Sequence, residues 1–195
     1  MVERVGILAI QGDIEAHEAA VRRCAAEPVR VLRKEHLDGL RALILPGGES
    51  TTIARGLDRL ELVEPLRDFA RSGRPLLGTC AGAILLSREA RNHPVPTLGL
   101  IDAVALRNDY GTQVDSFAAP ADPGGVLGKM RCVFIRAPRL ENLGAGVEVL
   151  ASVDSDPVLV RDGNVLAATF HPELTDDPSV HALLLETEAP EAPEG

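Results

Sequence analysis

The stretch Leu76-Leu77-Gly78-Thr79-Cys80-Ala81-Gly82-Ala83-Ile84-Leu85-Leu86 joins two apolar runs through a turn that holds one cysteine between two glycines. The run after Pro75 predicts a buried strand, and the run from Ala83 to Ala90 predicts a helix. This is the G-x-S-x-G nucleophile elbow with sulfur in place of oxygen. A nucleophile on so tight a turn has a strained backbone, and a side chain on either flanking glycine would collide with the neighbouring strand or helix.

The same turn directs the thiol at a helix N-terminus, where unpaired N–H groups favour a thiolate. The alternative is a structural cysteine in an ordinary strand–turn–helix unit, because free cysteines are commonly buried. The rest of the chain has to decide between these two interpretations.

Composition places the chain among globular proteins. It has 195 residues, 45% of them hydrophobic and 25% charged, which fits one domain with a sizeable core. The net charge of −9 argues against a nucleic-acid surface, and no apolar run is long enough to cross a membrane. Three unpaired cysteines and the absence of a signal-peptide pattern at the N-terminus predict free thiols in a cytoplasmic protein.

The first half of the chain alternates buried strands with amphipathic helices. Continuous apolar strands are expected at 5–10, 29–32, 42–45 and 76–79, with helices at 14–26 and 53–71, the latter interrupted at Pro65. This pattern is typical of a doubly wound parallel sheet. In the helix at 14–26, His17 and Glu15 are expected to be exposed. The segment Pro46-Gly47-Gly48-Glu49 follows a strand, so its backbone can approach a ligand, and Ser50 or Thr51 can cap the next helix.

The second half looks mixed or antiparallel. Short strands are expected at 113–117, 132–135, 147–153, 158–161 and 165–169, a loop at 118–128, and a final helix at 178–188. Asp162-Gly163 predicts a hairpin turn, and Cys132 is expected to be a core thiol. The chain is therefore predicted to be one domain over residues 1–188, with residues 189–195 as a disordered acidic tail.

A cysteine nucleophile needs a base and a group that orients that base. Of the five histidines, only His171 follows a predicted core strand and has a carboxylate two residues later, at Glu173. In an extended segment, residues two apart point to the same side, so Glu173 can accept a hydrogen bond from one ring nitrogen while the other faces the thiol. An exposed histidine followed by a solvated glutamate remains the alternative.

These segments together resemble a known family. Pro46-Gly47-Gly48-Glu49-Ser50-Thr51, Gly78-Thr79-Cys80-Ala81-Gly82 and Phe170-His171-Pro172-Glu173 are similar to the motifs of class I (triad) glutamine amidotransferases. Further segments resemble one branch, the glutaminase subunits of pyridoxal 5′-phosphate synthase: 6–12, Arg107-Asn108, Gln113-Val114-Asp115-Ser116-Phe117 and Phe134-Ile135-Arg136-Ala137-Pro138. The resemblance implies a three-layer, flavodoxin-like α/β sandwich with a mostly parallel central sheet and an additional mixed or antiparallel portion.

The resemblance also implies roles for individual residues. Cys80 would attack the carboxamide of L-glutamine, His171 would move the proton, and Glu173 would orient His171. The backbone N–H groups of Gly48 and Ala81 would form the oxyanion hole. Glutamine contacts are implied at Gly48, Glu49, Ser50, Arg107, Ile135 and Arg136. From the residues alone, either arginine could equally be a solvated surface residue, and the sequence does not say which one meets the substrate carboxylate.

The resemblance implies a partner but no cofactor. Ammonia released from glutamine would pass to a separate (β/α)8-barrel synthase subunit in a large hetero-oligomer, with Gln11-Gly12 as the place where docking reaches the oxyanion loop. No metal site is expected, because the Cys and His residues lack ligand-like spacing. Two alternatives stay open: a γ-glutamyl hydrolase or the glutaminase of another pathway on the same scaffold, and a non-catalytic regulatory subunit.

Overall fold

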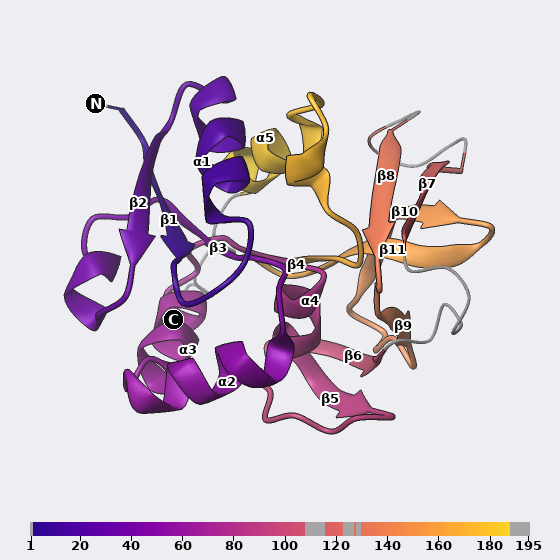
Figure 1. Cartoon of the computed structure of the whole chain (residues 1–195), viewed down its shortest axis with the longest axis horizontal. Coiled ribbons are helices and arrows are strands. Elements are labelled where there is room, and N and C mark those ends of the chain that lie inside the picture. The colour runs from indigo at the N-terminus through magenta and orange to yellow at the C-terminus, as the bar shows by residue number, and fades with distance from the viewer. Residues whose placement is uncertain (1, 108–115, 123–126, 128–129, 188–195) are drawn as a thin grey trace, which may run out of the picture.

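The chain folds into three layers around a seven-stranded sheet, seen in a computed structural model that describes residues 2–107, 116–122, 127 and 130–187 (Figure 1). The strand order is β10-β11-β12-β4-β3-β1-β2. These strands are β1 (Arg4–Leu8), β2 (Glu27–Val31), β3 (Ala42–Leu45), β4 (Leu76–Thr79), β10 (Glu148–Val153), β11 (Asp156–Asp162) and β12 (Val165–Ala168). The predicted α/β sandwich is therefore confirmed.

Parallel pairing joins the five strands β12, β4, β3, β1 and β2. Strands β3, β4 and β12 are buried along their whole length, as their uninterrupted apolar sequences predict. Strands β10 and β11 extend this sheet with antiparallel pairing, and β11 turns into β12 through Gly163 and Asn164, directly after Asp162, which pairs with Val165. The mixed second half and the hairpin are thus as predicted.

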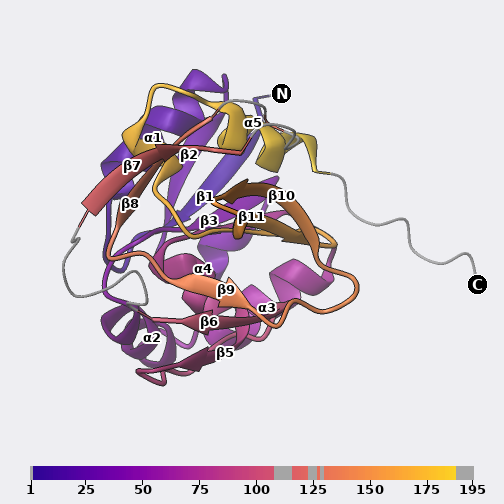
Figure 2. The same ribbon diagram turned by 90° about the vertical axis from the view of Figure 1, so that its right-hand side faces the viewer.

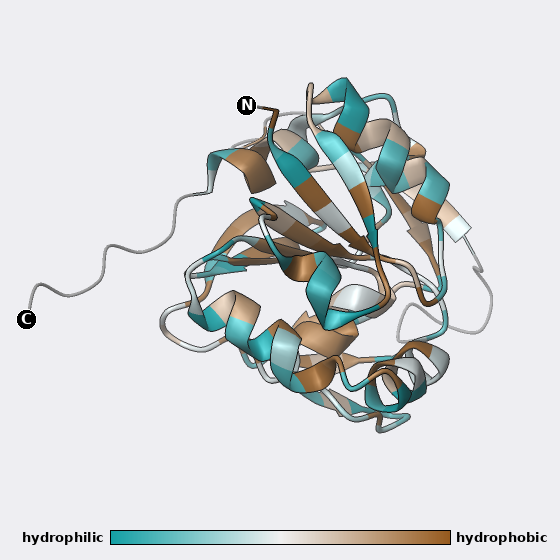
Figure 3. Cartoon of the chain, turned by 90° about the vertical axis from the view of Figure 1, so that its left-hand side faces the viewer, coloured by the Kyte–Doolittle hydropathy of each residue, from teal (hydrophilic) through white to brown (hydrophobic). Residues whose placement is uncertain are grey.

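Helices and small sheets cover both faces of the central sheet (Figures 1 and 2). One core cluster forms beneath α1 (Ile14–Arg23) and α5 (Ser179–Glu186), and it also includes Cys132 and Phe134 of β8 (Arg131–Ile135). The other forms beneath α2 (Ser50–Arg59), α3 (Val63–Arg71) and α4 (Ala81–Leu86). Figure 3 shows mainly hydrophobic central strands and helices with alternating hydrophobic and hydrophilic bands, as expected for amphipathic covering helices.

Two smaller sheets lie outside the central one. The first has the order β5-β6-β9, and the second pairs β7 with β8. Their strands are β5 (Ser87–Arg91), β6 (Ile101–Leu106), β7 (Ser116–Pro120), β8 (Arg131–Ile135) and β9 (Arg139–Glu141). Two 3₁₀ turns, η1 (Lys34–Leu37) and η2 (Pro172–Leu174), complete the described elements.

The topology places the site. The chain moves from β1 to β2 on one side and to β3 and β4 on the other, so the strand order reverses beside β1. Ligands of open α/β sheets bind beyond the carboxyl ends of strands at such a reversal. The segments that follow β1, β3, β4 and β12 all lie at this edge, because these strands are mutually parallel.

Several predicted boundaries were wrong. The expected helix at 53–71 is two helices that break at 60–62, whereas Pro65 sits in the first turn of α3, where its missing N–H costs nothing. The expected helix at 83–90 ends at Leu86, and Ser87 begins β5 by pairing with Ile101. Part of the expected loop at 118–128 is strand β7, paired with β8.

Other expectations fall on residues outside the described part of the chain. These include most of the strand expected at 113–117, the segment around Asn108, and the tail at 189–195. Among the described residues, no helix is both long and apolar enough to span a bilayer.

Candidate active site

Cys80 occupies a strained backbone position between β4 and α4. Its φ is 48° and its ψ is −104°, outside the conformations that most non-glycine residues adopt. A Cβ on Gly82 would lie 2.0 Å from the backbone oxygen of Leu45, and one on Gly78 would lie 2.6 Å from the backbone of Gly82. Both flanking glycines are therefore required by close backbone approach, as the elbow motif predicted.

His171 and Glu173 follow β12 at the same edge of the sheet. Nδ1 of His171 donates a hydrogen bond to Oε1 of Glu173 over 2.7 Å, and both side chains are buried. The predicted pairing of a histidine with a carboxylate two residues later is therefore present. The exposed-histidine alternative is excluded by this burial.

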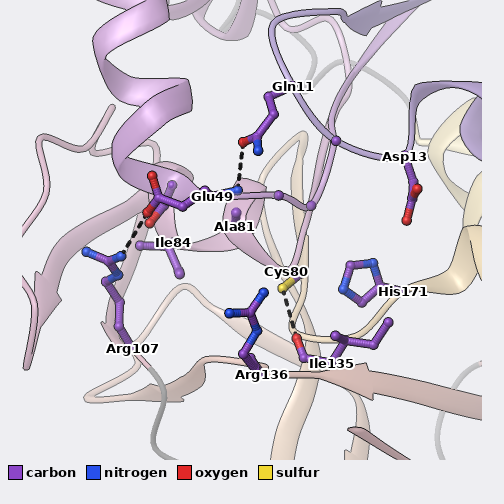
Figure 4. A pocket seen from close by; sticks show the side chains of 14 residues that line it. Gln11, Asp13, Glu49, Cys80, Ala81, Ile84, Arg107, Ile135, Arg136 and His171 are labelled. Carbon is purple, nitrogen blue, oxygen red and sulfur yellow. Dashed lines mark hydrogen bonds and ion pairs between the residues drawn. The ribbon is translucent and has the colours of Figure 1, made fainter. Parts of the chain in front are cut away.

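The thiol and the imidazole form one polar unit. Burial lowers the pKa of His171, but hydrogen bonds with Cys80 and Glu173 more than offset it and raise the pKa to about 10. The other neighbour of the thiol is the backbone carbonyl of Ile135, 3.7 Å from Sγ (Figure 4). A charged His171 beside Cys80 favours the thiolate, which is the nucleophilic form.

A cavity of about 390 Å³ opens over Cys80. It brings together nearly all of the site residues predicted from sequence, from five separate segments. Those that line it are Gly48, Glu49, Ser50, Cys80, Ala81, Arg107, Ile135, Arg136 and His171. Glu173 lies behind His171, away from the cavity, as an orienting group should.

Glu49 caps helix α2 with its side chain. Its carboxylate accepts hydrogen bonds from the backbone N–H groups of Thr51 and Thr52 and from the Thr52 hydroxyl. Burial raises the pKa of Glu49, but these bonds outweigh it and lower the pKa to about 2. The expected cap at Ser50 or Thr51 was therefore wrong, because Glu49 supplies two acceptor oxygens one position earlier.

The two site arginines differ in their partners. Arg107 approaches Oε1 of Glu49 at 3.3 Å and donates to the carbonyl of His93 over 2.7 Å. Arg136, at the end of β8, is exposed and forms no ion pair with any residue that the structure describes. Its guanidinium therefore keeps its donors available to a ligand in the cavity.

Gln11 holds the loop after β3. Its Oε1 accepts a hydrogen bond from the Glu49 N–H over 2.8 Å, and the same oxygen would lie 3.1 Å from a Cβ on Gly48 (Figure 4). The segment after the first strand thus contacts the loop expected to supply an oxyanion donor.

Sequence reasoning missed a buried polar cluster behind the triad. His17 was expected to be exposed, but it is fully buried and lies against His181 of α5 and Thr79 of β4. It stands three and four residues before Ala20 and Val21, so helical spacing placed it on the buried face of α1. This spacing indicated a buried His17, but the general tendency of histidines to be exposed led to the opposite prediction.

Asp13 was also missed. It is exposed, lines the cavity and points toward His171 in Figure 4. Ligand atoms of Asp13, His171 and Glu173 lie within 4.8 Å of one another, although Nδ1 of His171 and Oε1 of Glu173 are already bonded together. That the site needs no metal stays a prediction.

A cysteine on a nucleophile elbow, with a His–Glu pair after a neighbouring parallel strand, defines a triad hydrolase of the glutamine amidotransferase class. The chain belongs to the SNO glutamine amidotransferase family, whose signature it matches over residues 7–188. Membership of this family favours the nucleophile interpretation of the elbow cysteine over the structural one.

Individual relatives agree with this assignment. The chain is 49% identical to the pyridoxal 5′-phosphate synthase subunit PdxT of Thermus thermophilus, over 93% of this chain and 96% of the relative. It is 45% identical to PdxT of Thermotoga maritima, over 94% of this chain and 98% of that relative. A crystal structure of a glutamine amidotransferase superposes with a TM-score of 0.89 at 49% identity, covering 94% of this chain and 97% of the other.

Proposed function

We propose that this chain is the glutaminase component of pyridoxal 5′-phosphate synthase, hydrolysing L-glutamine to L-glutamate and ammonia for vitamin B6 biosynthesis. The observation that carries the proposal is the pair of Cys80 and His171 lining the cavity, with Glu173 bonded to His171 from behind. Identities of 45–50% over nearly whole chains with proteins named PdxT favour this pathway over a γ-glutamyl hydrolase or another glutaminase.

In the first half of the reaction, Sγ of Cys80 attacks the side-chain carboxamide carbon of glutamine. The C=O electrons move to the oxygen, and the backbone N–H groups of Ala81 and Gly48 stabilise that oxyanion. Collapse of the intermediate breaks the C–N bond, and His171 gives the leaving nitrogen its proton. Ammonia departs and a glutamyl thioester remains on Cys80.

In the second half, water attacks the thioester carbon and gives a proton to His171. The C–S bond breaks, Cys80 is restored and glutamate leaves. Throughout both halves, Glu173 keeps Nδ1 of His171 occupied, so the other ring nitrogen faces the reacting atoms.

The cavity suggests how glutamine is held. Arg136 carries free donors, so we assign to it the α-carboxylate of the substrate, for which a guanidinium is well suited. The carboxylate of Glu49 is already occupied by three bonds from Thr51 and Thr52 and by Arg107. The Glu49 N–H is bonded to Gln11 as well, so Glu49 anchors the loop that presents Gly48 and Ser50 to the substrate. Ile135 forms the opposite wall.

A synthase partner follows from the proposal. The relatives are named as subunits, and free ammonia is useful only where a second enzyme consumes it. We propose a (β/α)8-barrel synthase subunit, assembled with this chain in a cytoplasmic hetero-oligomer. Docking would act through Gln11, which already holds Glu49. The Gln11→Ala variant should lose most of the stimulation by the synthase; unchanged stimulation would contradict this route.

One isotope experiment tests the pathway. The chain and its synthase are supplied with amide-¹⁵N glutamine, and the pyridoxal 5′-phosphate formed is analysed by mass spectrometry. Because this product has a single nitrogen, the proposal predicts ¹⁵N in its ring. Release of labelled ammonia without incorporation would point to the glutaminase of another pathway. No ammonia release would favour a regulatory subunit.

A further inference from the structure

Glu173 has two carboxylate oxygens, and the triad uses only one of them. Oε1 accepts the hydrogen bond from His171, whereas Oε2 is buried and makes no hydrogen bond to the residues that the structure describes. Oε2 lies 3.5 Å from Nε2 of His17, a side chain that is itself fully buried. A buried carboxylate oxygen without a donor is costly, so this neighbour matters.

His17 lies at the centre of a chain of three contacts. Its Nε2 is 3.2 Å from Oγ1 of Thr79, and its Nδ1 is 3.0 Å from Nε2 of His181. Thr79 Oγ1 also accepts the backbone N–H of Gly47 over 3.1 Å. His17 therefore connects the orienting carboxylate to the loop that carries Gly48 and to the residue before the nucleophile.

The contacts favour one arrangement of protons. If Nε2 of His17 carries the proton, it faces the oxygens of Thr79 and Glu173, and Nδ1 accepts from Nε2–H of His181. If the proton sat on Nδ1 instead, a nitrogen lone pair would face the Glu173 carboxylate in a buried site. Oε2 of Glu173 and Nδ1 of His181 have no hydrogen bond to the described residues, and the first arrangement at least turns an N–H of His17, rather than a lone pair, toward Oε2.

The ionisable groups around this cluster come from several elements. His171 and Glu173 lie on one side of His17, His181 of α5 lies on the other, and Arg23 faces His181. Burial and the neighbouring histidines hold the pKa of His17 well below its usual value. Burial lowers the pKa of His181 to about 4, so both rings are neutral at neutral pH and can keep the arrangement described.

We infer that His17 is a positioning residue of the triad: as a neutral Nε2–H tautomer held by His181, it restrains Glu173 through Oε2 and ties Thr79 to the oxyanion loop. It touches neither substrate nor reacting atoms. Its effect is to fix the carboxylate that fixes His171, so that the charged imidazole stays beside Cys80. This role rests on the proposed function only for the name of the substrate.

The test uses the pH dependence of Cys80 alkylation by iodoacetamide, followed by mass spectrometry of the Cys80 peptide, in the full chain with its synthase. In His17→Leu, Glu173 is free to turn away from His171, so the alkylation midpoint should rise by about one pH unit. At neutral pH kcat should fall about tenfold, with KM for glutamine little changed. His17→Gln, which replaces the Nε2–H with an amide donor, should restore most of both values.

Val21→Ala is the matched control, because Val21 is buried on the same helix and belongs to the hydrophobic core, and its side chain has no polar atom that could bond to this cluster. It should lower thermal stability and leave the midpoint and kcat unchanged. An unchanged midpoint and kcat in His17→Leu would overturn the inference, as would an equal change in Val21→Ala. Alkylation needs no glutamine, so this outcome is separate from failure of the proposed function.

The wild-type chain supplies a second test that requires no variant. Long-range ¹H–¹⁵N NMR of the histidine rings distinguishes the tautomers directly. We expect neutral Nε2–H rings for His17 and His181 at pH 7. An Nδ1–H tautomer at His17 would overturn the inference even if His17→Leu failed to fold.

Discussion

Gly47 lies against His171 so closely that a Cβ on it would stand 2.5 Å from Cε1 of the imidazole. The same atom would stand 3.2 Å from Cβ of Cys80. The loop after β3 and the His–Cys pair are thus packed with no room between them, which fixes the distance between the nucleophile and the proposed oxyanion donor on the next residue.

Gly47→Ala should therefore impair catalysis rather than folding. The added methyl group must displace His171 or the loop, and misplacement of about 1 Å typically costs about a hundredfold in rate. Ammonia release should fall accordingly while the thermal unfolding midpoint changes little. Gly146→Ala is the control, because its φ is not left-handed and the nearest atom to its added Cβ is a carboxylate oxygen of Asp162 at 3.9 Å, an ordinary contact. Equal activity in the two variants would contradict this packing argument.

The three cysteines should differ sharply in reactivity. Cys80 lies beside His171, whose pKa is raised to about 10, whereas burial raises the pKa of Cys132 to about 12 and also raises that of Cys24. Limited iodoacetamide at pH 7, followed by peptide mass spectrometry, should label Cys80 first and leave Cys132 unmodified. Pre-incubation with glutamine should slow the labelling of Cys80. Preferential labelling of Cys132 would be inconsistent with the structure.

The two arginines should affect different kinetic constants. Arg136→Ala should raise KM for glutamine at least about tenfold, because it removes a charge-assisted contact with the substrate carboxylate. Arg107→Ala frees Glu49 and the loop, so its effect should fall mainly on kcat. Steady-state ammonia release over a range of glutamine concentrations separates the two. A larger KM effect for Arg107→Ala would reverse our assignment of the carboxylate.

Stability should decrease as the pH falls below about 6.5. The pKa of His181 is about 4 in the folded chain and near 6.5 in an exposed histidine. Between these values the unfolded chain binds a proton that the folded chain does not, so unfolding becomes easier by up to about 3 kcal/mol at pH 4. The lowered pKa of His17 acts in the same direction.

Urea unfolding of His181→Leu at pH 7 and pH 4.5 measures this contribution. In this variant, the free energy of unfolding should differ less between pH 7 and pH 4.5 than it does in the wild type. In His93→Asn, a change at an exposed loop position, the wild-type difference should remain. The raised pKa of His171 has the opposite effect on stability. Its contribution to the free energy of unfolding is present below about pH 6.5 and is lost as the pH rises toward 10. A pH-independent stability between 4.5 and 7 would contradict the burial of these rings.

The sequence predicted what depends on local patterns. Uninterrupted apolar runs placed β3, β4 and β12, and the spacing of Gly78, Cys80 and Gly82 identified the elbow because backbone contact excludes any side chain there. The His171–Glu173 pair could be predicted for the same reason, because its geometry is determined within three residues.

What depends on partners distant in sequence was not predicted. Helix α4 stops at Leu86 because Ser87 pairs with a strand fourteen residues later, and His17 is buried because His181 and Thr79 meet it from other elements. Helix α2 is capped by Glu49 rather than by Ser50 or Thr51, because the Glu49 carboxylate reaches two backbone donors and Arg107 together. The end of α4 and the burial of His17 thus result from tertiary contacts that a local pattern does not contain, whereas the Glu49 cap is local and was missed because Ser and Thr were preferred as capping residues.

The central claim is that Cys80 is the nucleophile of a glutaminase, and ammonia release by the Cys80→Ala variant tests it most directly. Wild type and variant are assayed with glutamine and the synthase, after circular dichroism shows equal folding. The account predicts that the wild type releases ammonia and that the variant falls by at least about ten-thousandfold, as loss of a catalytic nucleophile typically causes. Comparable rates in the two proteins would contradict it.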